Sequence, residues 1–273
     1  MQSTYTIFGN AGFIGNKLTK KLSESGCQLI LPVKGDLTCL SIPLGHVIYA
    51  AGLTADFRKR PFDTVNAHVC LINTILEKCD FESLTYLSST RVYAENNITS
   101  EDAAVTVNVN TQSDFYNLSK LMGESICLNS GRDNIKIARL SNVVGIRNDS
   151  DLFIDQLIRE GMNTGKVVFQ TAYNSSKDYI HIDDVTKLII KLANSPVSGV
   201  YNIASGENIT HLQIANHLEK CLGFQCSEQP GAVSWKFNPI CTNKIRSALD
   251  AQPRKFDDYF PDFLNEYKLN QSR

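Results

Sequence analysis

The chain has 273 residues, of which 42% are hydrophobic and 20% are charged, and its formal net charge is −1 at pH 7. This length suits one large domain or two modest ones, and the balanced charge excludes a strongly basic surface for nucleic acid or anionic membranes. No apolar run reaches the roughly 18 residues that a membrane-spanning helix needs.

The N-terminal residues and the cysteines indicate where in the cell the protein is expected to be located. A first strand is expected by Tyr5, which leaves no room for a signal peptide. The eight cysteines include no C-x-x-C pair, and several of them fall in apolar helical patterns. We therefore expect free thiols, no metal site and a cytoplasmic location.

Short apolar strands alternate with amphipathic helices in the first half of the chain. The predicted strands are TYTIFG, CQLILPV, HVIYAAG, SLTYLSST and IKIARLSN, and the predicted helices span 10–25, 63–79 and 115–128. This alternation is typical of a parallel, doubly wound sheet. Only about 15 residues separate Leu31 from His46, so the usual third strand and its helix should be reduced.

The pattern changes after Gly145. A helix (152–161), a strand (166–170) and a loop (171–177) precede the segments DYIHIDD and GVYNIAS, with helices predicted at 184–193 and 210–222. The sequence thus predicts an α/β fold of Rossmann type with a smaller C-terminal substrate lobe. We expect a dinucleotide domain of residues 1–144, with a return segment at about 178–204. The lobe would comprise 145–177 and 205–273.

Three glycines form G-x-x-G-x-x-G between the first strand and the first helix: Gly9, Gly12 and Gly15. Glycine permits the tight turn and the close approach of backbone to a pyrophosphate, and the helix N-terminus supplies N–H donors. The position of the motif indicates a dinucleotide site.

The end of the second strand lacks the acid that such sites usually carry. An Asp or Glu about 20 residues after the turn normally holds the adenosine ribose. Here Val33 and Lys34 occupy that place, and the first acid is Asp36. Lys34 is a candidate partner of the 2′-phosphate of NADP, and a solvent-exposed loop lysine is the alternative.

A second motif, YNLSK, places Tyr116 and Lys120 on one face of a helix. An ammonium beside a phenol favours the phenolate and lowers the tyrosine pKa from about 10. The pair predicts a general acid/base for proton transfer that accompanies hydride transfer.

Seven segments then occur in a familiar order: FGNAGFIG, VIYAAG, YLSSTRVY, YNLSK, ARLSNVVG, KDYIHIDDV and GVYNIASGENIT. Over nearly the whole chain they resemble the extended short-chain dehydrogenase/reductases, the nucleotide-sugar epimerase/dehydratase family. The combination is specific for the family and much less specific for the reaction.

The resemblance implies a cofactor site. The three glycines would hold the pyrophosphate, Asp36 and Leu37 would contact adenine, and 50–52 would line the nicotinamide. The full set of cofactor-binding residues is Gly9, Gly12, Phe13, Ile14, Gly15, Lys34, Asp36, Leu37, Ala50, Ala51, Gly52, Tyr116 and Lys120. The cofactor would be NADP or NAD.

The resemblance also assigns the chemistry. Ser89 would hydrogen-bond the reacting sugar oxygen, Tyr116 would be the acid/base, and Lys120 would hold the nicotinamide ribose and tune Tyr116. The implied substrate-binding residues are Thr54, Ser89, Thr90, Arg91, Asn142, Arg147 and Lys177.

Several of these residues have a purely structural alternative. Asn142 would contact the nucleotide diphosphate or merely form a turn, and Lys177 stands where many members have an arginine. Asn66 matches a helix asparagine near the active-site helix. His181 looks like a metal ligand, but no second His or Cys is suitably spaced, so we expect it to be structural.

Departures from the family pattern reduce the number of candidate reactions. The 4,6-dehydratases carry Asp-Glu directly after the catalytic Ser/Thr, where this chain has Thr90 and Arg91, which argues against dehydration. GDP-fucose synthase uses a Cys and a His where this chain has Arg91 and Arg147, and arginine is no base near neutral pH. The two arginines suggest instead an anionic or hydroxyl-rich sugar.

Two reactions remain, a 4-epimerase with tightly held NAD and a 4-ketoreductase that consumes NADPH. The compressed stretch before Asp36 resembles the deoxysugar reductases, which favours the 4-ketoreductase and NADP, and the epimerase is the alternative. A non-catalytic NAD(P) sensor is an alternative of another class. By resemblance we also expect a homodimer through helices 63–79 and 115–128, a nucleotide-sugar substrate, and no nucleic acid or membrane partner.

Overall fold

A six-stranded parallel sheet forms the centre of the computed structural model, which describes residues 2–36, 38–54, 56–147 and 152–271. Its spatial order is β2-β1-β3-β4-β5-β9, and every neighbouring pair is parallel. The strands are β1 (Thr4–Phe8), β2 (Gln28–Ile30), β3 (His46–Tyr49), β4 (Ser83–Ser89), β5 (Ile135–Leu140) and β9 (Gly199–Ile203).

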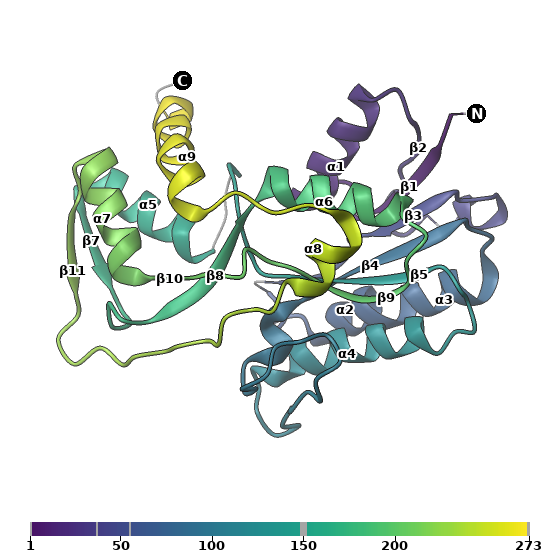
Figure 1. Ribbon diagram of the computed structural model, residues 1–273, viewed down its shortest axis with the longest axis horizontal. Helices are drawn as coiled ribbons and strands as arrows, with labels where there is room; N and C mark the ends of the chain where they lie inside the picture. Colours follow the sequence, from purple (N-terminus) through teal and green to yellow (C-terminus); the bar gives the residue numbers. More distant parts are fainter. Residues whose placement is uncertain (1, 37, 55, 148–151, 272–273) are drawn as a thin grey trace.

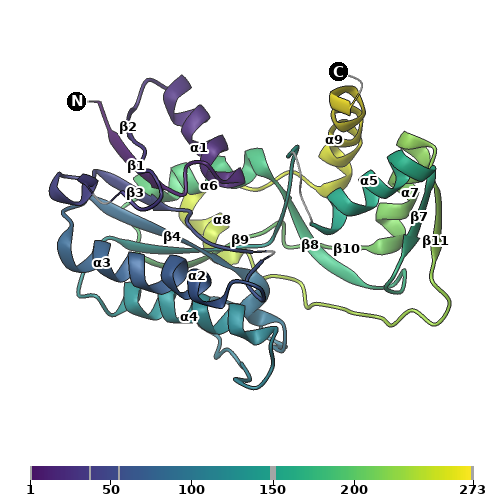
Figure 2. The same ribbon diagram turned by 180° about the vertical axis from the view of Figure 1, so that it is seen from behind.

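Helices cover both faces of this sheet (Figure 1). One face carries α1 (Phe13–Glu24) and α6 (Ile182–Asn194). The other carries α2 (Pro61–Val65), η2 (Asn66–Cys70), α3 (Leu71–Lys78) and α4 (Asp114–Leu128), as the reverse view in Figure 2 also shows. The predicted α/β fold of Rossmann type is therefore confirmed.

The connection between β2 and β3 is short, as the sequence predicts. Its described part holds a single 3₁₀ turn, η1 (Thr38–Ser41), and no strand. As a result β2 forms the edge of the sheet, and β1 pairs directly with β3 on its other side. The predicted second strand is shorter than expected and ends at Ile30, because the chain turns away to reach η1.

The smaller C-terminal lobe has two small sheets, one of β6 (Asn142–Val144), β8 (Ser176–His181) and β10 (Asn208–Thr210), the other of β7 (Lys166–Phe169) and β11 (Gln225–Glu228). These pack with α5 (Phe153–Thr164), α7 (His211–Leu222) and α9 (Phe256–Gln271). The helix α8 (Asn243–Leu249) contacts β9 of the large sheet. Sequence periodicity missed β6, β10 and β11 because strands of three or four residues are too short to show alternation.

The predicted helix 63–79 is not continuous. It begins at Pro61, and a π turn from Asn66 to Cys70 separates its two α-helical parts. A π turn inserts an extra residue into the helix and rotates the side chains that follow, and such turns often lie at functional sites. Here it directs His68, which is fully buried, toward α4.

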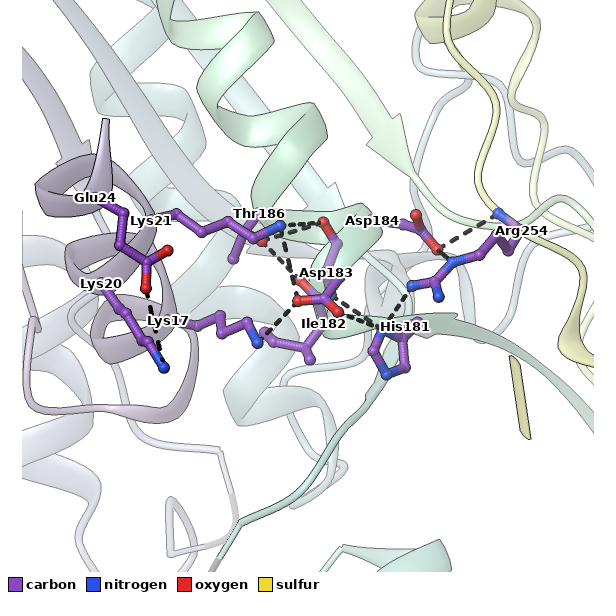
Figure 3. Close-up of polar contacts among 10 residues, drawn as sticks. All are labelled: Lys17, Lys20, Lys21, Glu24, His181, Ile182, Asp183, Asp184, Thr186 and Arg254. Atoms are coloured by element: carbon purple, nitrogen blue, oxygen red, sulfur yellow. Dashed lines mark hydrogen bonds and ion pairs between the residues drawn. The ribbon is translucent and has the colours of Figure 1, made fainter. Parts of the chain in front are cut away.

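A chain of polar contacts fastens α1, α6 and the segment before α9 to one another (Figure 3). The Nζ atom of Lys17 lies 2.9 Å from Oδ1 of Asp183, and Nε of Arg254 lies 2.9 Å from Oδ2 of Asp184. Between them, Nδ1 of His181 caps α6 and lies 2.8 Å from Nη2 of Arg254. Burial lowers the pKa of His181, so the neutral ring accepts these hydrogen bonds and serves the fold.

Candidate active site

A cavity of about 650 Å³ lies where the large sheet meets the lobe. Its walls come from the carboxyl ends of β3, β4 and β5, from α4, α5 and β8, and from the segment around Trp235. In open α/β sheets the carboxyl ends of the strands are where ligands bind. The fold therefore places this cavity where chemistry is expected.

Most of the predicted site residues meet at this cavity. Those that line it are Ile14, Ala50, Gly52, Thr54, Ser89, Thr90, Arg91, Tyr116, Lys120, Asn142, Arg147 and Lys177. Gly9, Gly12, Phe13, Gly15, Ala51, Lys34 and Asp36 are not among the lining residues, and Leu37 lies outside the described residues.

The glycine-rich turn between β1 and α1 leaves no room for side chains. Gly9 has φ +82°, and a Cβ there would lie 2.7 Å from the backbone of Ala50 and Ala51. A Cβ on Gly15 would lie 2.1 Å from the carbonyl oxygen of Gly9. The helix α1 begins without a side-chain cap or an acidic residue in its first turn, so its N–H groups suit a phosphate. These features fit a dinucleotide pyrophosphate.

The adenosine side of the site is exposed. Lys34 and Asp36 are both exposed, and Oδ1 of Asp36 accepts a hydrogen bond from the N–H of Thr38 at 2.9 Å. The side chain of Asn10 donates to the carbonyl oxygen of Pro32 at 2.8 Å and fixes the end of this segment. No carboxylate stands directly at the end of β2, as the sequence indicates.

Tyr116 lies at the bottom of the cavity and is only 5% exposed. Burial raises the pKa of Tyr116, while hydrogen bonds with Ser89 and Thr54 and the charge of Arg91 act to lower it. Ser89 also accepts a hydrogen bond from the N–H of Arg91 at 3.2 Å. The arrangement holds a protonated phenol beside a hydroxyl, ready to share a proton with a bound oxygen.

The Lys120 ammonium is held by the backbone of β4. Its Nζ atom donates to the carbonyl oxygen of Leu87 at 2.9 Å, and burial lowers the pKa of Lys120 to about 8. A second cation, Arg91, acts on Tyr116, and its guanidinium carbon lies 5.8 Å from the tyrosine ring centroid. The i,i+4 spacing put Lys120 on the correct face, but its side chain turns toward β4.

His68 was missed by the sequence analysis, which singled out Asn66 instead. Asn66 is exposed, whereas His68 is fully buried and its ring meets that of Tyr116 edge-on at 5.5 Å. The backbone N–H of Leu53 donates to Nε2 of His68 at 3.2 Å. Because Asn66 and His68 are two residues apart, they face different sides of the helix, and His68 is the one whose ring contacts Tyr116.

A buried ion pair joins β5 to α4 close to Ser89. Arg139 on β5 and Glu124 on α4 are 5% and 3% exposed, and Nη2 of the arginine lies 2.6 Å from Oε2 of the glutamate. Ser88 donates to Oε1 of Glu124 at 2.5 Å, and Nη1 of Arg139 donates to the hydroxyl of Tyr93 at 2.6 Å. The network locks β4, β5 and α4 together directly beside Ser89.

The lobe side of the cavity carries two cations over aromatic rings. The Nζ atom of Lys177 lies 4.9 Å from the Trp235 ring centroid and 5.5 Å from that of Phe237. The guanidinium carbon of Arg147 lies 3.7 Å from the ring centroid of Phe13, at the start of α1. Asn142 donates from Nδ2 to the carbonyl oxygen of Asp178 at 2.8 Å.

Among the described residues, no group of three or more His, Cys, Asp and Glu side chains is placed to hold a metal ion. None of the described helices has the length and apolar character to cross a membrane.

Solved structures with this fold include sugar-nucleotide enzymes. MoeE5 in complex with UDP-glucuronic acid and NAD matches with a TM-score of 0.80 at 18% identity, covering 96% of each chain. The UDP-glucuronic acid 4-epimerase from Bacillus cereus, also with NAD, gives 0.78 at 17%, over 97% of this chain and 99% of the other. RMD from Pseudomonas aeruginosa, complexed with NADPH, gives 0.78 at 19%, over 96% and 97%. At these identities the likeness establishes the fold.

Sequence comparison supplies the family. The model of the NAD dependent epimerase/dehydratase family matches residues 5–204, nearly three quarters of the chain. No curated protein sequence matches the chain significantly. The glycine turn, the Ser89–Tyr116 contact and this match make the chain a member of the NAD dependent epimerase/dehydratase family, within the extended short-chain dehydrogenase/reductases. The resemblance drawn from the sequence motifs, and with it the enzyme class, is confirmed.

Proposed function

We propose that this protein transfers hydride at C4 of a nucleotide-activated sugar, with NAD or NADP as its cofactor. The observation that carries the proposal is the meeting of Ser89, Tyr116 and Lys120 at one cavity, beside the glycine turn. These three residue types supply what hydride transfer at a secondary alcohol requires, a hydrogen-bond donor, a proton carrier and a cation.

In this mechanism Tyr116 takes the proton of the C4 hydroxyl during oxidation and returns it during reduction. Ser89 donates a hydrogen bond to the same oxygen and holds it in place. Lys120 binds the nicotinamide ribose and balances charge near Tyr116. A bound nicotinamide accepts and returns the hydride. Because burial raises the pKa of Tyr116, the free enzyme holds the phenol protonated, and the reductive direction starts without prior loss of that proton.

The leading reaction is 4-epimerisation with NAD. The family is NAD-dependent by description, and similar folds include a UDP-glucuronic acid 4-epimerase with NAD. An epimerase removes hydride from C4 and returns it to the other face of the same carbon, so it needs no other acid or base than Tyr116.

The second candidate is a 4-ketoreductase that uses NADPH. The observation in its favour is the missing carboxylate at the end of β2, where Lys34 is exposed and available to a 2′-phosphate. One measurement distinguishes the two candidate reactions: the mass of the cofactor that co-purifies. Tightly bound NAD supports the epimerase, whereas loosely bound NADP supports the reductase.

A direct assay tests the shared step. The purified protein is mixed with UDP-glucose or UDP-glucuronic acid and NAD, and C4 epimers are separated by chromatography. For the reductase, NADPH absorbance is followed with 4-keto-sugar nucleotides. Product in the wild type and none in Tyr116→Phe supports the proposal. A wild-type protein that binds cofactor but changes no sugar nucleotide would favour a non-catalytic sensor.

The same proposal assigns a separate binding role to each of the two parts of the chain. Residues 1–144, with the return segment at about 178–204, would bind the cofactor, and 145–177 with 205–273 would bind the substrate. Arg147 and Lys177 lie on the lobe side of the cavity and suit the nucleotide diphosphate, with Asn142 nearby.

We also propose a homodimer through α2, α3 and α4. These helices expose large apolar side chains to solvent, with Phe62 84%, Met122 53% and Leu128 47% exposed. Burial of such side chains between two copies is favourable. Light scattering is expected to give twice the chain mass for the wild type and a monomer for Met122→Asp with Phe62→Asp. A monomeric wild type at micromolar concentration would contradict this.

A further inference from the structure

The wall of the cavity carries more positive charge than the proposed hydride transfer uses. The cavity is lined by more basic than acidic residues. The acids are Asp56, Asp155 and Asp178, and the six basic residues are Arg58, Lys59, Arg91, Lys120, Arg147 and Lys177. Asp178 is already engaged, since its carboxylate accepts hydrogen bonds from Ser205 and Gly206. Within the described ranges no ion pair joins Arg58, Arg91 or Lys177 to a carboxylate.

Arg91 has the most informative position in this cluster. Its guanidinium carbon lies 5.8 Å from the ring centroid of Tyr116 and 5.6 Å from that of Phe57, and the two rings are 5.4 Å apart. Arg58 lies over Phe57 as well, at 4.5 Å. Arg58, Phe57, Arg91 and Tyr116 therefore form one continuous wall, in which the guanidinium of Arg91 lies near the phenol and that of the exposed Arg58 lies over Phe57.

These cations repel one another. Burial and the charge of Arg58 lower the pKa of Arg91, and burial and the charge of Arg91 lower the pKa of Lys177. Asp114 acts on Arg91, but its carboxylate oxygens are taken by the Asn117 side chain and the Asn108 N–H, both at 2.9 Å. Arg91 and Lys177 are partly buried like charges without a carboxylate partner, which is unfavourable, and a bound anion would relieve them.

The diphosphate of a sugar nucleotide does not account for all of this charge. It extends from C1, across the sugar ring from C4, and Arg147 and Lys177 on the lobe side suit it. Arg91 lies near Tyr116, where the proposed function places C4, and Arg58 lies over the neighbouring Phe57. An anion there would have to be on the sugar itself, close to C4.

We propose that the substrate is a nucleotide sugar with a carboxylate at C6, a hexuronic acid, and that Arg91 and Arg58 bind that carboxylate. This inference rests on the proposed function, because it places C4 against Tyr116. The C6 carboxylate is joined to C5, the neighbour of C4, which brings it to the same edge of the ring as the reacting hydroxyl. The planar fork of Arg91 matches the two carboxylate oxygens.

The test compares two ligands that differ at C6 only, UDP-glucuronic acid and UDP-glucose, on the NAD-loaded protein by calorimetry. The wild type is expected to bind the uronic acid more tightly by on the order of 10- to 100-fold, as for a charge-assisted hydrogen bond. Arg91→Gln should remove most of this preference by weakening the uronic acid far more than UDP-glucose, and Arg91→Lys should retain part of it. Arg60→Gln is the matched control, since Arg60 pairs with Asp63 at 2.6 Å and does not line the cavity.

Equal wild-type affinity for the two ligands overturns the proposal. So does an equal loss for both ligands in Arg91→Gln, which would assign the arginine to the diphosphate. If neither ligand binds, glucuronate 1-phosphate and glucose 1-phosphate replace them, and equal affinity for that pair overturns it. Discrimination in binding without any turnover would count against the proposed hydride transfer and leave the carboxylate site standing.

Discussion

The Nδ1 atom of His68 lies 2.8 Å from the hydroxyl oxygen of Ser119, and this contact joins the π turn to the catalytic helix. The Leu53 N–H donates to Nε2 of the same ring, so the ring proton must reside on Nδ1 and point at Ser119. Ser119 in turn donates to the carbonyl oxygen of Tyr116 at 2.8 Å. The loop that precedes Thr54 is thereby held against the helix that carries Tyr116 and Lys120.

This buried histidine predicts a particular dependence of stability on pH. Burial and the charge of Lys120 lower the pKa of His68 to about 2, whereas an unfolded histidine titrates near 6.5. As the pH falls below about 6.5 the unfolded chain gains a proton that the folded chain does not, so folding becomes less favourable. His68→Gln cannot titrate. The stability deficit of this variant relative to the wild type should shrink by about 2 kcal/mol between pH 7 and pH 5 in urea unfolding. A constant deficit would mean that His68 is protonated in the folded protein.

Replacement of Lys120 is expected to abolish activity but to increase stability. Burial lowers its pKa to about 8 from a usual value of 10.5, so below pH 8 the folded protein holds an ammonium that it disfavours. Lys120→Met should abolish turnover yet unfold at a higher temperature at pH 7. That advantage should shrink by about 2 kcal/mol at pH 9.5, because the wild type regains stability as the unfolded chain alone keeps its proton. The exposed Lys187→Met on α6 should change neither quantity, and an unstable Lys120→Met would show that the ammonium is well solvated.

The glycine turn predicts a graded series of cofactor affinities. A Cβ on Gly15 would meet the Gly9 carbonyl oxygen at 2.1 Å, whereas one on Gly12 would approach it only to 3.2 Å. Gly15→Ala must shift the backbone of the turn and should weaken cofactor binding by about tenfold or more. Gly12→Ala should bind more tightly than Gly15→Ala. Fluorescence titration with NADH and NADPH measures the series, and equal affinities across it would contradict a site at this turn.

Lys34 decides the cofactor prediction. If its exposed ammonium faces a 2′-phosphate, Lys34→Asp should shift the ratio of affinities from NADPH toward NADH. The same titration, performed with both reduced cofactors, gives the ratio directly. Lys20→Asp, on the exposed face of α1, controls for the change in net charge. An unchanged ratio in Lys34→Asp would remove the main support for NADP.

The Glu124–Arg139 pair is expected to be the most sensitive point of the core beside the site. Glu124→Ala leaves the Arg139 guanidinium buried without its partner and should cost about 3 to 5 kcal/mol of unfolding free energy. Glu124→Gln keeps a side chain of similar shape that can still form hydrogen bonds, so it should lose less unfolding free energy. Urea denaturation compares the two variants, and similar losses for both would show that the lost charge, not the lost packing, dominates there.

The sequence by itself determined the fold class and the chemical groups of the site. Alternating strands and helices have clear periodicities, and the glycine turn requires specific residues because no Cβ fits there. The spacing of Tyr116 and Lys120 follows from helix geometry, so it too was readable. The shortened link between β2 and β3 was predicted from the number of residues alone.

Only the tertiary structure decided how these groups act on one another. The contact of His68 with Ser119 depends on the packing of this segment against α4, which a helical periodicity does not contain. Likewise, Lys120 turns to the Leu87 carbonyl and Arg91 approaches Tyr116, because burial and hydrogen bonding fix side-chain directions that spacing leaves open. Residues from distant parts of the chain share one cavity, and their mutual charges arise only once the chain has folded.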